Sequence, residues 1–299
     1  MENWLVTTGN ARLENGKIMY IPQKGKREDG TEFNYIAIIS SNIEFENGKI
    51  NFSIQTADKL ALAQVVLASE RGGNINIGMN AMGLLFGITK YDKENQRYEN
   101  PEGAGYYETY VPQNIYNYSV EVNGSVITLS VNGIKIAESI QDVKKGQVKF
   151  YLSGESEIVV SNIEVITKKP KAFIVMQFTE EYNQLYTEVI KPVCESFGLE
   201  VERADEFYTT TPIISDVIRS IVNSSIIIAE ITPDNANVYY EVGYAHAINK
   251  PTILLCERKK REKLPFDISG FRTLFYEDSI SGKSTVEKNL KKFLENINM

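Results

Sequence analysis

The chain has 299 residues, a length that suits two domains of ordinary size. Hydrophobic residues make up 42% and charged residues 24%, which is typical of folded globular protein and not of long disordered segments. The formal net charge is -7 and the pI is about 5.1. Because binding to a phosphate backbone needs a basic face, this acidic balance disfavours a nucleic-acid partner. The basic run from Arg258 to Lys263 is interpreted as a solvated loop.

Few side chains are available for metal or histidine chemistry. His246 is the one histidine, so a metal site with several histidine ligands is excluded. A catalytic triad that needs a histidine could use only His246. Cys194 and Cys256 lie in apolar segments and are expected to be buried thiols in a reducing compartment. The start lacks the features of a signal peptide, and no apolar run approaches the ~20 residues of a membrane helix. We therefore expect a cytoplasmic protein with no membrane association, no metal and no cofactor.

Residues 1–167 carry the pattern of short antiparallel strands. Apolar and polar residues alternate from Tyr116 onward, and similar stretches follow at 126–131 and 148–152. Asn-Gly occurs four times between such stretches, and it suits two-residue hairpin turns because both central residues need a positive φ. The segment from Tyr116 to Ala137 is therefore predicted to form three strands with two tight turns. Many short strands and no clear helix predict an antiparallel β-sandwich.

The same half resembles the concanavalin-like sandwiches of the laminin-G type. The resemblance is carried by Tyr118–Gly133, which reads YSVEVNGSVITLSVNG, by Gly146–Ile158, which reads GQVKFYLSGESEI, and by a closing strand at Ile158–Val165. Many relatives of this type bind carbohydrate, but no residue here identifies a sugar or calcium site. A group of tyrosines is open to two interpretations, a surface that stacks on a ligand or the core and rim of the sheet: Tyr106, Tyr107, Tyr110, Tyr116 and Tyr118.

After the basic linker Lys168–Lys171, the pattern changes to alternating strands and helices. Apolar runs of strand length lie at 172–176, 199–203, 226–231, 252–256 and 273–276. Helical spacing of apolar residues is found at 182–197, which ends at Gly198, at 213–222, which follows the start signal Thr211-Pro212, and at 238–248. The capping box Ser284–Glu287 is expected to begin the last helix. This alternation predicts a flavodoxin-like domain over 168–299, with a parallel sheet covered by helices on both faces.

Polar residues concentrate where these strands end, which is the edge where ligands bind in open parallel sheets. The loops there supply the candidate substrate-binding residues Gln177, Phe178, Arg203, Asp205, Asn235, Asn237 and Tyr240. Arg203 is suited either to bind phosphate or to pair with Asp205, and Tyr240 either to stack on a base or to pack in the core. Glu241, near the start of the third helix, faces either the ligand cleft or solvent, where it would only partner the helix dipole.

The segment Ile228–Pro251, which reads IAEITPDNANVYYEVGYAHAINKP, resembles the nucleoside 2-deoxyribosyltransferase-like superfamily, which lies close to the TIR-like nucleotide hydrolases of bacterial defence. Four other segments between 172 and 276 fit the same pattern in order. The resemblance implies that Glu241 is a nucleophile or stabilises an oxocarbenium ion at the anomeric carbon, and that Asp216 is an acid that contacts the base. Asn235 stands where transferases of this superfamily carry an aspartate, which is a departure from the strict pattern.

These observations lead to the hypothesis of a nucleotide N-glycosidase, either an NAD glycohydrolase or a nucleoside or nucleotide deoxyribosyltransferase. One buried carboxylate can stabilise or trap a sugar whose base departs, and the cationic nicotinamide of NAD leaves without a general acid. The alternative is a non-catalytic sensor that binds a nucleotide. In both cases the sandwich is expected to be a sensor or interaction domain. The protein is expected to form a homo-oligomer or to respond to a protein or signal molecule that binds the sandwich, as an antiphage defence effector would.

Overall fold

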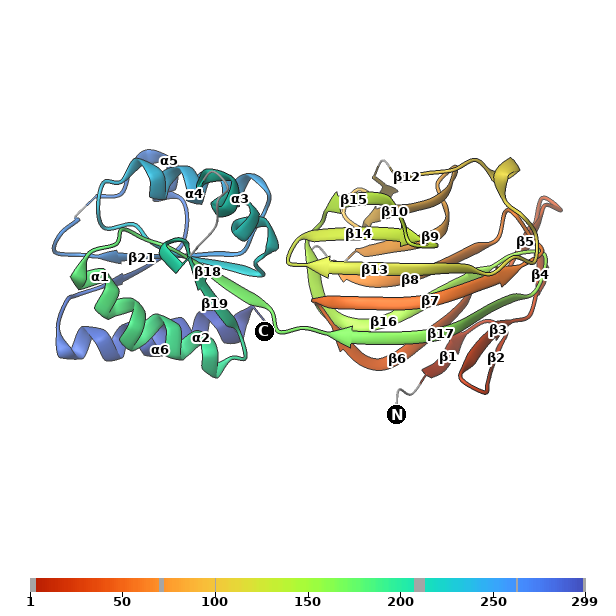
Figure 1. Cartoon of the computed structure of the whole chain (residues 1–299), viewed down its shortest axis with the longest axis horizontal. Coiled ribbons are helices and arrows are strands. Elements are labelled where there is room, and N and C mark those ends of the chain that lie inside the picture. Colours follow the sequence, from red (N-terminus) through yellow and green to blue (C-terminus); the bar gives the residue numbers. More distant parts are fainter. Residues whose placement is uncertain (1–3, 70–72, 100, 207–212, 262, 298–299) are drawn as a thin grey trace. The chain divides into compact units, whose positions relative to one another are not determined.

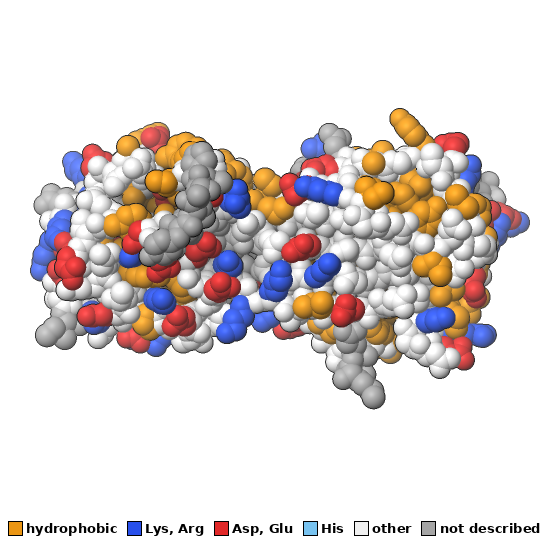
Figure 2. Space-filling view, viewed as in Figure 1, with side chains coloured by type: hydrophobic (Ala, Val, Ile, Leu, Met, Phe, Trp, Pro, Cys, Tyr) orange, Lys and Arg blue, Asp and Glu red, His pale blue; other side chains and the backbone are white. Residues whose placement is uncertain are grey.

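The computed structural model describes residues 4–69, 73–99, 101–206, 213–261 and 263–297 (Figure 1). The chain divides into two compact units, of which the first ends at Lys168 and the second begins at Lys169. Within the described ranges, no helix combines the length and the apolar character that crossing a membrane requires. On the face drawn in Figure 2, acidic and basic side chains are interspersed over both units.

The first unit is built from antiparallel strands, with one described 3-10 turn, η1 (Tyr107–Thr109). The strands are β1 (Trp4–Thr8), β2 (Ala11–Glu14), β3 (Lys17–Tyr20), β4 (Lys24–Lys26), β5 (Glu32–Asn34), β6 (Ala37–Phe45), β7 (Gly48–Thr56), β8 (Leu62–Ser69), β9 (Asn74–Ala81), β10 (Leu84–Asp92), β11 (Arg97–Tyr98), β12 (Glu102–Ala104), β13 (Tyr116–Asn123), β14 (Val126–Val131), β15 (Ile134–Ile140), β16 (Val143–Ser153) and β17 (Ile158–Thr167). They form two large sheets and the small hairpin β4-β5 in the described part of the chain.

One sheet has the order β1-β6-β16-β8-β9-β10-β11, with β12 beside β10, and the other has the order β15-β14-β13-β7-β17-β3-β2. Aromatic rings join them across the core. The ring of Phe52 stacks on Tyr118 with centroids 5.0 Å apart, and it meets the edge of Phe150 from the facing sheet at 5.2 Å. The first unit is therefore an antiparallel β-sandwich, as the strand pattern predicts. Of the tyrosines open to two interpretations, Tyr110 and Tyr118 are buried in the core, whereas Tyr106 is 74% exposed.

The three-stranded segment forms as predicted, with β14 paired to β13 on one side and to β15 on the other. The turn between β14 and β15 has a positive φ at both Asn132 (51°) and Gly133 (79°), as Asn-Gly predicts. The turn before it differs, because Asn123 is still paired with Val126 in the ladder. Its central residues are therefore Gly124 and the residue after it, one position later than the Asn-Gly pattern places them.

The second unit contains one parallel sheet. Its strands are β18 (Lys171–Val175), β19 (Glu200–Arg203), β20 (Ile226–Glu230), β21 (Thr252–Glu257) and β22 (Thr273–Tyr276). The described strands lie in the order β19-β18-β20-β21-β22, and every pair is parallel. This is the 2-1-3-4-5 order of doubly wound sheets, so the chain reverses its direction of progress between β18 and β20.

Helices cover both faces of this sheet (Figure 1). They are α1 (Glu180–Leu185), the π-helical turn η2 (Tyr186–Ile190), α2 (Lys191–Ser196), the 3-10 turn η3 (Ala204–Glu206), α3 (Ile213–Asn223), α4 (Ala236–Ala247), α5 (Phe266–Ser269) and α6 (Ile280–Asn296). The strands are apolar on both sides: Ile226 and Ile228 pack with α1, α2 and α6, whereas Ile227 and Ala229 pack with α3, α4 and α5. Such runs are expected of strands that helices cover on both faces.

The helix ends confirm the predicted stop at Gly198 and contradict the predicted capping box at Ser284–Glu287. Gly198 follows α2 with a φ of 77°, the left-handed conformation that a C-terminal stop requires. The capping-box prediction for Ser284–Glu287 is wrong, because α6 already begins at Ile280 and the hydroxyl of Ser279 accepts a hydrogen bond from the amide of Gly282. The start signal Thr211-Pro212 lies outside the described residues, and the description of α3 begins at Ile213.

Candidate functional site

A cavity of about 460 Å³ lies at the carboxyl edge of the parallel sheet, beyond the end of β18. This is the point where the strand order reverses, which leaves a crevice between the connections to either side. We call it the Glu241 cavity. Its described lining comes from β18 and the loop after it, from the start of η3, from the first described residues of α3, and from the N-cap and first turns of α4: Ile174, Met176, Gln177, Phe178, Ala204, Ile213, Ile214, Val217, Asn235, Asn237, Val238, Tyr240 and Glu241.

Helix α4 carries Glu241 into this cavity, and its start is fixed by Asn235. The Asn235 side-chain oxygen accepts hydrogen bonds from the amides of Asn237 at 2.9 Å and Val238 at 3.5 Å. This is an N-cap, which satisfies amides that have no partner within the helix. The buried Val238, together with Val242 one turn later, packs against the sheet. Asn237, Tyr240 and Glu241 lie on the adjacent side of the helix and line the cavity, as Val238 does. Asn235 and Asn237 are therefore lining residues, and Asn235 has a structural role as well.

Glu241 is partly buried, and burial raises the pKa of its carboxyl group to about 7. A carboxyl group in apolar surroundings resists ionisation because water no longer solvates its charge. Near neutral pH, therefore, both its protonated and its charged forms are populated. A side chain with such a pKa in a cavity is a candidate functional group.

The rest of the lining combines apolar walls with amides. Ile213 is 76% exposed beside the cavity, and Ile214, Phe178 and Tyr240 are about half exposed. Gln177, Asn235 and Asn237 supply side-chain amides. Among the described lining residues, Glu241 is the one charged side chain. The cavity thus suits an uncharged molecule with an apolar part better than an anion.

Arg203 and Asp205, two of the candidate substrate-binding residues, bind one another. The Arg203 guanidinium donates to both carboxylate oxygens of Asp205, at 2.6 and 2.5 Å, and to Asn183 at 2.9 Å. It also lies over the ring of Tyr186 at 4.3 Å and over that of Phe178 at 5.3 Å. Of the two roles open to Arg203, the structure selects pairing with Asp205, and neither residue is among the described lining of the cavity.

Asp216 is buried on α3, and its carboxylate lies 3.7 Å from the guanidinium of Arg219. The lining takes in its neighbour Val217 and the residues of the preceding turn but not Asp216 itself. The structure therefore brings Gln177, Phe178, Asn235, Asn237, Tyr240 and Glu241 to one cavity and leaves Asp216, Arg203 and Asp205 outside its described lining.

Sequence reasoning missed the apolar wall and the support behind the site. Ile213 and Ile214 read as core positions of a helix, yet they are 76% and 49% exposed beside the cavity. Arg261 was assigned to a solvated loop, yet its guanidinium donates to the backbone carbonyls of the loop before α4. His246, the one histidine, stacks on Phe271 with ring centroids 3.8 Å apart.

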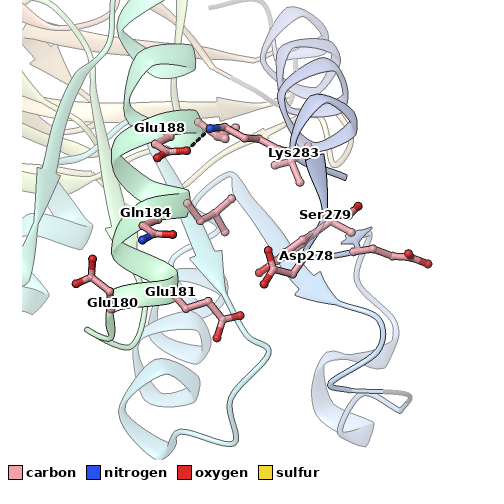
Figure 3. Close-up of a pocket in the computed structure, with 12 residues that line it drawn as sticks. Glu180, Glu181, Gln184, Glu188, Asp278, Ser279 and Lys283 are labelled. Carbon is pink, nitrogen blue, oxygen red and sulfur yellow. Dashed lines mark hydrogen bonds and ion pairs between the residues drawn. The ribbon is translucent and has the colours of Figure 1, made fainter. Parts of the chain in front are cut away.

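A second cavity of about 440 Å³ lies between α1 with η2 and the segment from the end of β22 to α6 (Figure 3). Its labelled side chains are mainly acidic. Glu188 and Lys283 point toward one another across it and form an ion pair, and Glu181 pairs with Lys260. These pairs neutralise part of its charge. Within the described ranges, no group of three or more His, Cys, Asp or Glu side chains is placed to hold a metal ion.

No protein-family model matches the chain, and no curated protein matches it. Among solved structures, a β-glucanase of Bacillus licheniformis matches with a TM-score of 0.42 at 10% identity, over 56% of this chain and 92% of its own. A carbohydrate-binding module from Bacillus subtilis has a TM-score of 0.36 at 12% identity, over 50% and 93%. A glycoside hydrolase family 16 endo-glucanase from Bacteroides ovatus has a TM-score of 0.38 at 11% identity, over 55% and 94%. The likeness concerns the fold alone, a β-sandwich over about half of the chain.

The expected nucleotide function is contradicted. The solved structures that match include glycoside hydrolases and a carbohydrate-binding module, and the comparisons give no support to a nucleoside 2-deoxyribosyltransferase-like or TIR-like second half. The cavity agrees with this correction, because its described lining offers a phosphate group no lysine or arginine and Arg203 is held by Asp205. NAD, nucleosides and nucleotides are therefore withdrawn as ligands, together with the inferred role in antiphage defence.

Proposed function

We propose that the second unit is an enzyme that acts on a glycosidic bond, and that the carboxyl group of Glu241 carries the reaction. The observation behind this proposal is a single carboxyl group, with a pKa raised to about 7 by burial, that faces a cavity at the reversal point of a parallel sheet. Open parallel sheets bind their ligands at this position. A partly desolvated carboxylate is suited to meet the positive charge that develops on a sugar when its substituent leaves.

The proposed reaction begins when the Glu241 carboxylate attacks or electrostatically stabilises the anomeric carbon. The bond between that carbon and the leaving group breaks, and the leaving group departs with the bonding electron pair. Water or another acceptor then takes the sugar and gives up a proton. Retaining glycosidases use a second carboxyl group ~5.5 Å away as the general acid, whereas the described lining here contains amides and one carboxyl. We therefore propose substrates whose leaving group departs without protonation.

The substrate is proposed to be an uncharged glycoside with an apolar leaving group. Amides of Gln177, Asn235 and Asn237 are suited to sugar hydroxyls, and Ile213 and Ile214 to an apolar substituent. The solved structures give the fold of half of the chain and no more, so this proposal rests on the cavity.

The test is turnover of nitrophenyl and dinitrophenyl glycosides from a panel of pentoses and hexoses. Wild-type protein is expected to release nitrophenolate, and Glu241→Gln is expected to lose at least about 10²-fold in kcat, since a carboxylate that acts in the transition state contributes this much or more. Azide, supplied to Glu241→Ala, should restore turnover and yield a glycosyl azide.

Wild-type kcat should rise with pH through about 7, because only the ionised form of Glu241 is active and burial raises its pKa to that value.

The matched control is Glu188→Gln, which removes an exposed carboxylate of the second cavity. This variant is expected to keep the wild-type rate. Absence of turnover across the panel, or a Glu241→Gln protein as active as wild type, would overturn the proposal.

The roles of the two units are also proposals. The sandwich up to Lys168 is proposed to bind a partner or a signal molecule, and copies of the chain are proposed to associate. Light scattering of the intact chain tests association. Turnover before and after protease cleavage at the linker tests regulation, and an unchanged rate would argue against a regulatory sandwich.

A further inference from the structure

An arginine in the segment after β21 binds the loop between β20 and α4. Arg261 Nη1 donates to three successive backbone carbonyls, those of Ile231 at 2.8 Å, Thr232 at 3.2 Å and Pro233 at 3.3 Å. Its Nη2 donates to the carboxylate of Asp234 at 3.2 Å. A planar guanidinium can serve several acceptors at once because its donors have fixed directions. One side chain therefore holds the whole connection that leads to the α4 N-cap.

Arg261 also reaches the helix itself and is anchored at its own backbone. Its guanidinium lies over the ring of Tyr239, in the first turn of α4, at 5.5 Å. Its amide donates to the carbonyl of Glu257 at 3.1 Å, and the Glu257 amide donates to the Thr232 hydroxyl at 2.7 Å. The loop before α4 is thus fixed to the segment after β21 through both the Arg261 side chain and the Thr232 hydroxyl.

We infer that Arg261 is a positioning residue, which holds the loop before α4 so that Glu241 keeps its place in the cavity. This inference rests on the proposed function for its kinetic consequence but not for its structural one. The path is short: the clamped loop ends at Asn235, which caps α4, and Asn237, Tyr240 and Glu241 follow within the first turns.

The neighbouring basic residues do not share this role. Lys259 pairs with Glu277 at 3.0 Å, and Lys260 pairs with Glu181 on α1. The side chain of Lys259 is 69% exposed, whereas that of Arg261 is 13% exposed. A lysine at position 261 would present one compact ammonium group in place of a planar fork, so it is not expected to satisfy all four acceptors.

Without the guanidinium, the loop carbonyls lose their shared donor and the start of α4 gains freedom. Water would then reach Glu241 more easily, and the pKa of its carboxyl group would fall toward the ordinary range. A displacement of the reacting carboxylate by about 1 Å can cost about 10²-fold in rate, even when the substrate still binds.

The experiment measures amide hydrogen exchange over 231–245 together with glycoside turnover, for Arg261→Gln, Arg261→Lys and the control Lys259→Gln. Both Arg261 variants are expected to exchange faster in this segment, while Lys259→Gln matches wild type. Turnover of Arg261→Gln should show kcat lowered about ten- to hundredfold with KM changed less, and the rise of kcat with pH should begin at lower pH. A merely structural role would leave that pH midpoint in place.

A milder variant keeps the test decisive if Arg261→Gln does not fold. Asp234 is 85% exposed at its side chain, so Asp234→Asn should fold while it weakens the contact with Nη2. It is expected to give a smaller increase in exchange over the same segment. Wild-type exchange in the Arg261→Lys and Asp234→Asn proteins would overturn the inference. Loss of the proposed function would appear separately, as activity that survives Glu241→Gln while exchange in Arg261→Gln is still raised.

Discussion

Glu241 is held in the folded state at a cost to stability. Its pKa is raised from 4.5 to about 7, so the folded state binds its proton more tightly than the unfolded chain does. The linked cost is absent below pH ~4.5, grows as pH rises between ~4.5 and ~7, and is fully present above that range. Placement of a poorly solvated acid in a cavity is the kind of local conflict that binding and catalytic sites tolerate.

Replacement of this acid by an amide should therefore stabilise the protein in a pH-dependent way. Glu241→Gln is expected to raise the free energy of unfolding by about 1–2 kcal/mol at pH 8, after allowance for the partial exposure of Glu241, and by much less at pH 5. Urea denaturation at both pH values measures the difference. An equal effect at pH 5 and pH 8 would contradict the assigned pKa. Glu230, whose pKa burial also raises to about 7, is present in both proteins and cancels.

The residues of the Glu241 cavity differ in how far sequence could predict them. Asn235 and Glu241 could be predicted as site residues because a polar loop and a carboxylate follow an apolar strand. Parallel sheets bring such loops together at one edge. The fate of Arg203 was open, since its choice between a ligand and Asp205 depends on side-chain geometry. Arg261 was missed because a run of basic residues reads as solvated. Nothing in the local sequence reveals that the fourth basic residue of this run contacts a backbone carbonyl 30 positions earlier.

At the scale of elements, apolar periodicity predicted the strands and helices better than capping patterns predicted where a helix begins. The β18–β22 strands and the α3 and α4 helices follow from apolar periodicity, because burial on two faces or on one stripe imposes it. The start of α6 did not follow, because Ser284 and Glu287 form a capping pattern inside a helix that already begins at Ile280. Ser279 caps the helix instead of Ser284. Which of the two serines is the cap depends on where β22 ends, at Tyr276.

Glycines at two helix ends provide a matched pair for a stability measurement. Gly198 follows α2 with a φ of 77°, whereas Gly270 follows α5 with a φ of -81°, and a Cβ at either would meet nothing within 4 Å. Gly198→Ala should lower the free energy of unfolding by about 1 kcal/mol, because alanine is strained at positive φ. Gly270→Ala should be neutral or slightly stabilising. Equal effects in chemical denaturation would show that backbone conformation does not decide the outcome.

At the scale of the whole molecule, the hydrophobic clusters separate at the unit boundary. One cluster joins the two sheets of the sandwich, and the other two lie on the faces of the parallel sheet, with no residue shared between units among those described. The change of sequence pattern falls at the linker Lys168–Lys171, which contains the boundary between the two units. The roles of the units could not be predicted in the same way, because hairpin and strand patterns encode packing and not ligands.

Separate cores should give separate unfolding transitions. Calorimetry of the intact chain is expected to show two, and Glu241→Gln at pH 8 should raise the midpoint of one while the other stays fixed. The transition that moves belongs to the second unit. A single transition that shifts as a whole would mean that the units unfold together.

The strand order determines where a fragment that contains only the second unit can begin. β18 is the first strand after the junction, yet it lies inside the sheet with β19 on one side and β20 on the other. A fragment that starts at Lys169 keeps all five strands, whereas one that starts at Met176 leaves β19, and with it Arg203, without the neighbour to which it is bonded. The link between β17 and β18 is only the three residues 168–170, so a fragment must begin within it to keep β18 whole. A start a few residues later removes a strand from the interior of the sheet and not from its edge.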